Sequence, residues 1–490
     1  MNKNLALLIG LAATIGCLSG TTVTSSTAGS VTSAGGESGS GSASGTASAS
    51  AGSSGVIATT SGGSGSSSSG GNGSGTTGAP GVLVWDGPHF YPVGADADPF
   101  IPNDAYLGLA VGDLNNDKKL DLVVLHVSDN TVNVLLGNGD GSFKPAVSYP
   151  IGMDVSGEGQ LYLADFNGDG NLDLAVPGGG SAANSYTTKA AIFLGRGDGT
   201  FEPTTYSPPL GGTRGITVGD ANGDGKPDLL TNLLSQGQIG FLRGDGDGGF
   251  EPLEMSPATS AFPYSRWITA GDFNGDHQLD VAVADGMGYK NDAGTAEITV
   301  LFGNGDGTFT LNDHYPALPT AASWGGAPPA VNSGPVVNPE DIQALDVNDD
   351  GKLDLIESLY DHNIDIYLNN GDGSFQPAVG YVTGEYPRCV AAADMNGDGV
   401  TDLVVGNIGC YGLPDAGIGI SGNCAPSVGS VAILIGNGGG TFQAPVLLKP
   451  FLFPEWIVVG DFDGDGRPDL AITQVQDGHS LAVYLNRTAP

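Results

Sequence analysis

The residues best suited to chemistry in this sequence are aspartates in a nine-residue motif that recurs seven times. The first copy runs from Asp113 to Asp121, and the common form is D-x-[ND]-x-D-G-x-x-D. Such a loop offers side-chain oxygens at its first, third, fifth and ninth positions and a backbone carbonyl at its seventh. Calcium prefers about six to eight oxygen ligands, so each copy is predicted to wrap one Ca²⁺ ion.

The side chains predicted to bind these ions occupy the same four positions in every copy. They are Asp113, Asn115, Asp117 and Asp121; Asp165, Asn167, Asp169 and Asp173; Asp220, Asn222, Asp224 and Asp228; Asp272, Asn274, Asp276 and Asp280; Asp346, Asn348, Asp350 and Asp354; Asp394, Asn396, Asp398 and Asp402; and Asp461, Asp463, Asp465 and Asp469. The seventh copy is the richest because all four of its ligands are carboxylates.

The sixth position of the motif is normally glycine, which permits a sharp reversal of the chain. Lys118 and His277 replace it in the first and fourth copies. A side chain is strained at positive φ, so these two sites are expected to bind calcium most weakly. A single copy also suits an Asx turn without an ion, but seven copies at one place in a repeat favour metal. We interpret the ions, up to seven, as structural, with no catalytic residue among their ligands.

The elements that must position these loops are short β-strands. Apolar runs flank each motif, and a third run leads into a Gly/Asn/Asp turn, as at 137–143. The Phe that ends the turn is predicted to open the fourth strand. Four strands per repeat predict an all-β, seven-bladed β-propeller of four-stranded antiparallel blades. The last repeat stops after three strands, at 481–485. Residues 87–93 resemble the missing strand, so the N-terminal strand is predicted to complete the last blade and close the ring.

With these motifs the chain resembles the bacterial FG-GAP/VCBS repeat family, which is related to the N-terminal β-propeller of the integrin α-subunit. The resemblance covers residues 81–490. The Phe-Gly and Gly-Ala-Pro boxes of integrins are replaced here by Gly-Asp-Gly-Thr/Ser-Phe and Pro-Ala forms. All seven blades carry the cation loop, whereas integrins use it in only some. The resemblance implies a ligand face opposite the calcium loops.

The N-terminal segment is typical of an exported protein. Residues 1–16 are predicted to be a signal peptide, too short to span a bilayer permanently. The sequence ending at Cys17 resembles a bacterial lipobox, which leaves two alternatives: lipidation of Cys17 or plain cleavage. Residues 17–80, rich in Gly, Ser and Thr, are predicted to be a disordered tether. We expect a secreted protein or a lipoprotein of the cell surface or outer envelope.

Three cysteines lie beyond the tether. In an oxidising compartment Cys410 and Cys424 are predicted to form a disulfide, which leaves Cys389 buried and free. Pairing of Cys389 with Cys410 is the alternative.

The charge balance restricts the partners. The chain has 53 acidic and 16 basic residues and a net charge of -37. Its field repels polyanions, which argues against nucleic acid and anionic lipid. We expect a monomer whose contact with a membrane is limited to a lipid on Cys17.

Irregular insertions indicate where a ligand binds. Segments 178–189, 286–296 and 409–429 join the second and third strands of their repeats, and 312–339 joins two repeats. All four should emerge on the face opposite the calcium loops. Variable loops on a regular scaffold usually carry the binding function, so this face is the predicted ligand-binding face. The aromatic residues on this predicted rim are Tyr186, Tyr289, Trp324 and Tyr411.

A second candidate for ligand binding lies at the start of the innermost strands. The position six residues before the first Asp of the motif is Arg214, Arg266 or Arg388 in three repeats, with Trp267 and Trp456 nearby. These residues suit an anionic or sugar ligand, held by charge and stacking. The alternative is that the arginines pair with Glu340 and Glu455.

These features favour a binding or adhesion module for a glycan or surface protein. The alternatives are a carbohydrate-active enzyme of the polysaccharide lyase type and a purely structural envelope protein. The sequence has no HExxH motif, no nucleophile elbow and no histidine cluster, so we predict no enzymatic activity.

Overall fold

The computed structural model describes residues 83–93, 107–155, 161–178, 188–211, 215–233, 237–256, 265–285, 297–318, 339–359, 363–409, 429–451, 454–476 and 479–488. Throughout these residues the regular structure is entirely β. No helix in this part of the chain is therefore available to cross a membrane. The predicted signal peptide, the tether and Cys17 lie outside the described residues.

The strands form seven four-stranded antiparallel sheets, which we number as blades 1 to 7 in chain order. Blade 1 contains β2 (Leu107–Gly112), β3 (Asp121–His126), β4 (Thr131–Leu135) and β5 (Val147–Pro150); blade 2 contains β6 (Tyr162–Ala164), β7 (Asp173–Pro177), β8 (Ala190–Phe193) and β9 (Thr205–Tyr206); blade 3 contains β10 (Ile216–Gly219), β11 (Asp228–Leu233), β12 (Gln238–Leu242) and β13 (Glu254–Met255); and blade 4 contains β14 (Ser265–Gly271), β15 (Asp280–Asp285), β16 (Glu297–Gly303) and β17 (Phe309–Pro316).

The remaining three blades follow the same order. Blade 5 contains β18 (Pro339–Leu345), β19 (Asp354–Leu359), β20 (Asn363–Tyr367) and β21 (Val379–Val382); blade 6 contains β22 (Pro387–Ala393), β23 (Asp402–Asn407), β24 (Gly429–Leu434) and β27 (Val446–Phe451), with a small hairpin of β25 (Gly436–Gly438) and β26 (Thr441–Phe442); and blade 7 contains β28 (Pro454–Gly460), β29 (Asp469–Gln476), β30 (His479–Asn486) and β1 (Trp85–Tyr91).

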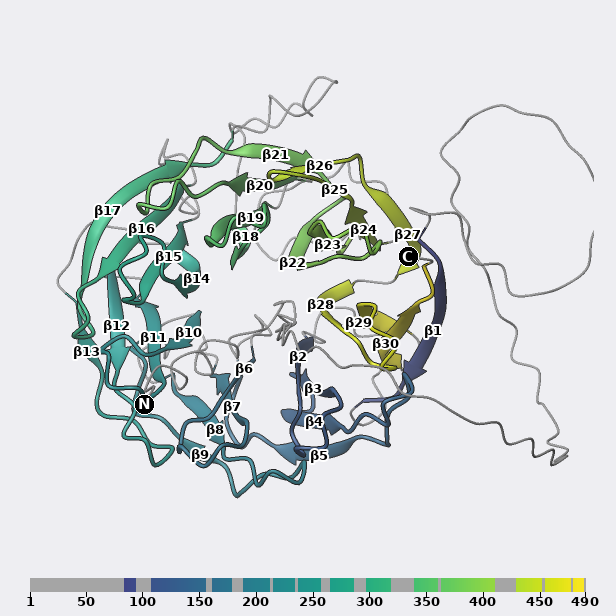
Figure 1. Cartoon of the computed structure of the whole chain (residues 1–490). Helices are drawn as coiled ribbons and strands as arrows, with labels where there is room; N and C mark the ends of the chain where they lie inside the picture. Colours follow the sequence, from purple (N-terminus) through teal and green to yellow (C-terminus); the bar gives the residue numbers. More distant parts are fainter. Residues whose placement is uncertain are drawn as a thin grey trace, which may run out of the picture.

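The blades are arranged in a ring, with the first strand of each blade nearest the centre (Figure 1). Blade 7 is completed by the N-terminal strand: β1 pairs with β30 from Trp85 opposite Asn486 to Tyr91 opposite Leu481. The predicted seven-bladed propeller and its closure by the N-terminal strand are therefore confirmed.

The core lies between the blades. The second strand of blade 1 is buried along its whole length, from Asp121 to His126, because each of its faces meets a neighbouring blade. This explains why the inner strands have continuous apolar runs instead of alternating ones. The spacing between blades is tight: a Cβ added at Gly112 would lie 2.7 Å from Leu172 Cδ1 of blade 2.

The phenylalanine after each hairpin turn does not usually open the fourth strand, as the sequence had suggested. Phe143 forms one isolated bridge with Gly137, and β5 begins only at Val147. The Phe143 ring instead packs edge-on against Phe462 of blade 7, with centroids 5.5 Å apart. Equivalent rings meet between blades 2 and 3 and between blades 4 and 5. These phenylalanines therefore join adjacent blades.

Candidate metal centre

The seven repeated motifs, hereafter cation loops 1 to 7, connect the first strand of each blade to the second. The Gly-Asp-Gly turns of blades 1 to 5 connect the third strand to the fourth. Because neighbouring strands are antiparallel, both kinds of connection lie at the same end of a blade. The cation loops and these turns therefore lie on one face of the propeller.

Each cation loop is curved by hydrogen bonds from its own backbone to its own side chains. In loop 2 the Asp165 carboxylate accepts the N–H of Asp169 at 3.1 Å and that of Gly170 at 2.9 Å. Asn167 Oδ1 accepts the same Asp169 N–H at 2.9 Å. The other six loops repeat these three bonds. The first and third side chains therefore turn toward the inside of the loop.

The curvature requires left-handed backbone at two positions. At the sixth position Lys118 has φ of 66° and His277 has φ of 68°, as the glycines of the other loops do. The strained conformation predicted for these two residues is thus confirmed. The fourth position is also left-handed, with φ of 58° at Asn116 and 60° at Asp349. This second left-handed position was not predicted, although glycine at the fourth position of the other five loops is its signal in the sequence.

The ninth side chain of each loop is fully buried, and its carboxylate fastens the loop to the third strand's end. Asp121 Oδ2 accepts the N–H of Leu114 at 2.9 Å, and Oδ1 accepts the N–H of Gly137 at 2.8 Å. The six equivalent aspartates make the same pair of bonds, at 2.6–3.1 Å. Sequence reasoning assigned these residues to metal alone; they also hold the backbone together.

Burial raises the pKa of all seven ninth-position aspartates. The pKa of Asp228 and of Asp469 rises to about 7, and that of the other five to about 6. The two backbone N–H donors oppose this rise, and neighbouring carboxylates add to it: those at the first and fifth positions in loops 1 to 6, and Asp463 and Asp465 in loop 7. The ionised form is therefore under-compensated by the protein's own groups, and a cation in the loop would supply the missing positive charge.

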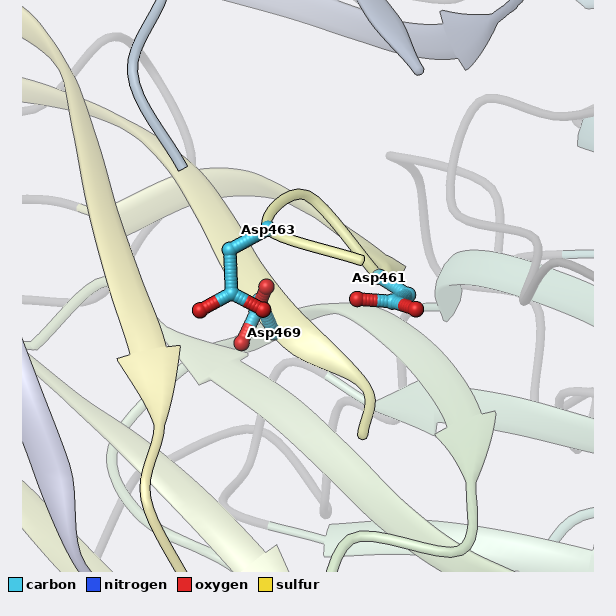
Figure 2. A group of neighbouring side chains, drawn as sticks. All are labelled: Asp461, Asp463 and Asp469. Carbon is cyan, nitrogen blue, oxygen red and sulfur yellow. The ribbon is translucent and has the colours of Figure 1, made fainter. Parts of the chain in front are cut away.

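Loop 7 shows the convergence of carboxylates most clearly. Oxygens of Asp461, Asp463 and Asp469 lie within 4.8 Å of one another. In Figure 2 the Asp463 and Asp469 carboxylates lie close together, with Asp461 across the loop. Oxygen-only donors on a curved loop fit a calcium ion, which accepts carboxylates and carbonyls in flexible geometry.

The cation loops are also tied to the neighbouring blade. The N–H of Gly141 in the blade 1 turn donates to the carbonyl of Phe462 in loop 7 at 3.0 Å, and that of Gly199 donates to Leu114 O in loop 1 at 3.0 Å. Blades 3 and 4 repeat the bond to the preceding loop. A change in the conformation of one of these loops would therefore alter a hydrogen bond to the next blade.

The opposite face carries the predicted binding rim. The connections β7–β8, β15–β16 and β23–β24 join second to third strands, and the connection β17–β18 joins two blades, so all four leave the end away from the cation loops. Tyr186, Tyr289, Trp324 and Tyr411 lie outside the described residues.

Of the candidate ligand-binding residues, Arg214 lies outside the described residues, and Arg266 is the second residue of β14. Arg388 is buried, with its Nε 3.3 Å from Glu455 Oε2. This is the ion pair weighed as the alternative to ligand binding.

Trp267 and Trp456 come from blades 4 and 7. Their indole groups meet at the centre of the propeller, with centroids 6.2 Å apart. Both side chains are only 1% exposed. They pack on each other, so stacking on a ligand, as the sequence suggested, would require the rings to separate.

Cys389 is a free thiol in the structure and is buried in β22. Cys410 and Cys424, the predicted disulfide partners, lie outside the described residues.

Comparison with known proteins identifies the repeat. A model of the FG-GAP-like repeat matches residues 113–176, 181–231, 346–405 and 418–472. T-cell immunomodulatory proteins of Rattus norvegicus and Mus musculus are each 29% identical over 167 residues, which is 32% of this chain and 26% of theirs. The matched segment thus spans about a quarter of these curated relatives.

Among solved structures, the fold is similar to that of a lectin from Agrocybe aegerita, described for its recognition of non-reducing terminal N-acetylglucosamine. The TM-score is 0.50 at 16% identity, over 82% of this chain and 94% of the lectin chain. At that identity the likeness shows the fold alone.

Proposed function

Because this chain is a β-propeller built from FG-GAP-like repeats, we propose that it is an extracellular calcium-binding module that binds a glycan or a surface protein. The ligand would bind on the face opposite the cation loops. The observation that carries the calcium assignment is the buried ninth-position aspartate, which recurs in all seven loops beside two further carboxylates in loops 1 to 6 and three in loop 7. We further propose that the protein is secreted or held at the cell surface through Cys17.

The donor set supports calcium over softer metals. The loops offer carboxylate, amide and carbonyl oxygens, which suit hard cations, and Ca²⁺ tolerates the irregular geometry of a peptide loop better than Mg²⁺ does. When bound, calcium would supply the positive charge that offsets repulsion among the loop carboxylates. Asp165 and Asn167 would turn their oxygens to the ion, and Asp173 would do so while keeping its backbone bonds.

The topology supports a ligand on the opposite face. The cation-loop face is built from near-identical loops and turns, whereas the connections on the other face differ in length from blade to blade. Irregular loops on a rigid scaffold are where binding specificity usually resides. The FG-GAP-like repeats and the T-cell immunomodulatory relatives favour a binding module over an enzyme. The likeness to a lectin makes N-acetylglucosamine-terminated glycans our first probe.

The calcium proposal is tested by melting the purified full chain in EDTA, in calcium and in magnesium. A ligand at about 100 times its dissociation constant adds about 2.7 kcal/mol per site to the free energy of unfolding, so calcium should raise the Tm strongly. Magnesium at the same concentration should raise it less. An unchanged Tm on chelation would mean that the loops are Asx turns without an ion.

The ligand proposal is tested with a glycan array and a polysaccharide-cleavage assay on the same protein. The matched variants replace Arg214 and Arg266 together by Gln, which keeps the buried Arg388–Glu455 pair, or replace Arg196 and Arg243, which lie in hairpin turns on the other face. Binding lost only in the first variant, without turnover, supports the proposal. Turnover would instead identify an enzyme, and no glycan or protein ligand at all would favour a structural role.

A further inference from the structure

The seventh cation loop differs from the other six at its third position. Asp463 stands where loops 1 to 6 have Asn, so loop 7 has four carboxylates. By charge alone this loop should bind a divalent cation most tightly, because calcium affinity rises with the number of charged ligands. That expectation takes no account of the side chains that surround the loop.

In the structure, guanidinium groups from the same chain already contact these carboxylates. Arg487 Nη1 contacts Asp463 Oδ2 and lies 3.1 Å from Asp465 Oδ2. Arg467 Nη2 also contacts Asp465 Oδ2. The Asp463 side chain is only 8% exposed, so its contact with Arg487 is shielded from water.

Loops 1 and 5 show that this arrangement is unlike an ordinary surface pair. There Lys119 and Lys352 approach the fifth-position carboxylate of their own loops, at 3.9 Å and 3.2 Å. Arg487 instead comes from outside the loop and reaches its third and fifth positions together. Its guanidinium group therefore contacts the carboxylate oxygens that loop 7 would use to bind a cation.

Arg487 is at the same time part of the ring closure. Its backbone N–H donates to Val84 O at 2.7 Å, and the N–H of Val84 donates to Thr488 Oγ1 at 3.0 Å. Its Nη2 lies 3.7 Å from Asp86 Oδ2 in the N-terminal strand β1. The preceding residue, Asn486, donates its N–H to Asp469, the ninth residue of loop 7, at 2.7 Å.

From this geometry we infer that Arg487 is a built-in counter-cation of loop 7, which lowers the loop's affinity for calcium and couples its occupancy to the pairing of β1. The inference rests on the proposed calcium function. Calcium and the guanidinium compete for the oxygens of Asp463 and Asp465. Loop 7 is then the site that responds to calcium concentration, and Arg487 holds the junction together when calcium is low.

The test uses isothermal titration of calcium into the EDTA-treated full chain, with Arg487→Gln. Removing a positive charge that contacts two ligand carboxylates should tighten one class of site by about tenfold. In an Asp463→Asn background, which gives loop 7 the pattern of the other loops, the same substitution should have much less effect. Arg196→Gln is the matched control, since this hairpin arginine contacts Glu202 and the Phe201 carbonyl and no cation loop.

Hydrogen exchange of residues 83–93 provides a second readout. Without calcium, Arg487→Gln should speed exchange in β1, and calcium should restore the wild-type protection. If wild type binds calcium but Arg487→Gln leaves every affinity and the exchange of β1 unchanged, the inference is wrong and the proposed function stands. If wild type binds no calcium, the proposed function fails first and the inference with it.

Discussion

Asp228 Oδ1 accepts a 2.8 Å hydrogen bond from the backbone N–H of Gly244, which lies 16 residues further along the chain. The bond joins the end of a cation loop to the turn that closes the outer hairpin of the same blade. The same carboxylate also accepts the N–H of Ala221 at 3.0 Å. Since every blade repeats this arrangement, the residue expected to bind an ion is also the residue that fixes the loop.

The first prediction concerns this double role. At pH 5 and without calcium, Asp228 is protonated in the fold, so the substitution removes no charge. Asp228→Asn should then lower the free energy of unfolding by about 1–3 kcal/mol, because one backbone N–H faces an amide N–H₂ instead of an oxygen acceptor. The measurement is thermal or urea unfolding in EDTA. Asp247→Asn, an exposed aspartate in the turn of the same blade, is the control. Equal losses in both variants would contradict a specific role for the buried carboxylate.

The second prediction is a pH dependence of the metal-free protein. The seven ninth-position aspartates have pKa values of about 6 to about 7 in the fold, against 3.8 when unperturbed. The folded state therefore retains protons that the unfolded state has lost, and stability falls as pH rises from about 4 through about 7. In EDTA the Tm should be higher at pH 5 than at pH 8.

Calcium should reverse that trend, because it compensates the ionised carboxylates. The rise in Tm on adding calcium is expected to be larger at pH 8 than at pH 5, where protons compete for the same oxygens. An EDTA-treated protein whose Tm increases between pH 5 and pH 8 would show that these carboxylates are well compensated without an ion.

The third prediction concerns the two loops that lack glycine at the sixth position. Lys118→Gly should raise the free energy of unfolding by about 1 kcal/mol, because Lys118 has φ of 66° and glycine adopts this conformation without strain. His277→Gly should act in the same direction. Lys119→Gly is the control, since it changes the neighbouring lysine at a position that is not left-handed and should destabilise. Calcium affinity, measured by titration, should rise in the first two variants alone.

The fourth prediction concerns the centre of the ring. Trp456→Ala removes one of two large buried rings that contact each other and should cost about 3–5 kcal/mol in the free energy of unfolding. Trp456→Phe keeps an aromatic ring and removes an indole N–H that has no hydrogen-bond partner among the described residues, so it should cost much less. Thermal unfolding compares the two variants. Similar Tm values for Trp456→Ala and wild type would show that the contact contributes nothing.

The fold was predictable because its sequence motifs repeat once in every blade. Seven motifs alternating with Gly-rich turns define the blades, and the short last repeat indicates that residues 87–93 supply its missing strand. The pairing of Trp85 with Asn486 confirms this prediction. The position of the cation loops at one end of each blade also follows from strand order alone.

The contacts that depend on distant segments were not predictable. Nothing in the sequence near Asp463 indicates that Arg487 contacts it, because that contact requires the last blade to be closed by the first strand. Likewise, Trp267 and Trp456 occupy equivalent positions in their blades. Their indole groups come into contact only because the propeller has a particular diameter, which the sequence does not reveal. The turn phenylalanines were assigned to a strand because a local pattern does not reveal contacts between blades.

Closure by the N-terminal strand has a consequence for the time course of folding. Val84 and Thr488 are hydrogen-bonded although 404 residues separate them. At about 5–20 residues per second, a ribosome needs roughly 20–80 s to make that stretch. Blades 1 to 6 contain only local strand pairs and can form within that interval, whereas β1 must wait without its partner. We therefore expect ring closure to be the latest step of assembly, and β1 to be the strand that a chaperone would protect most.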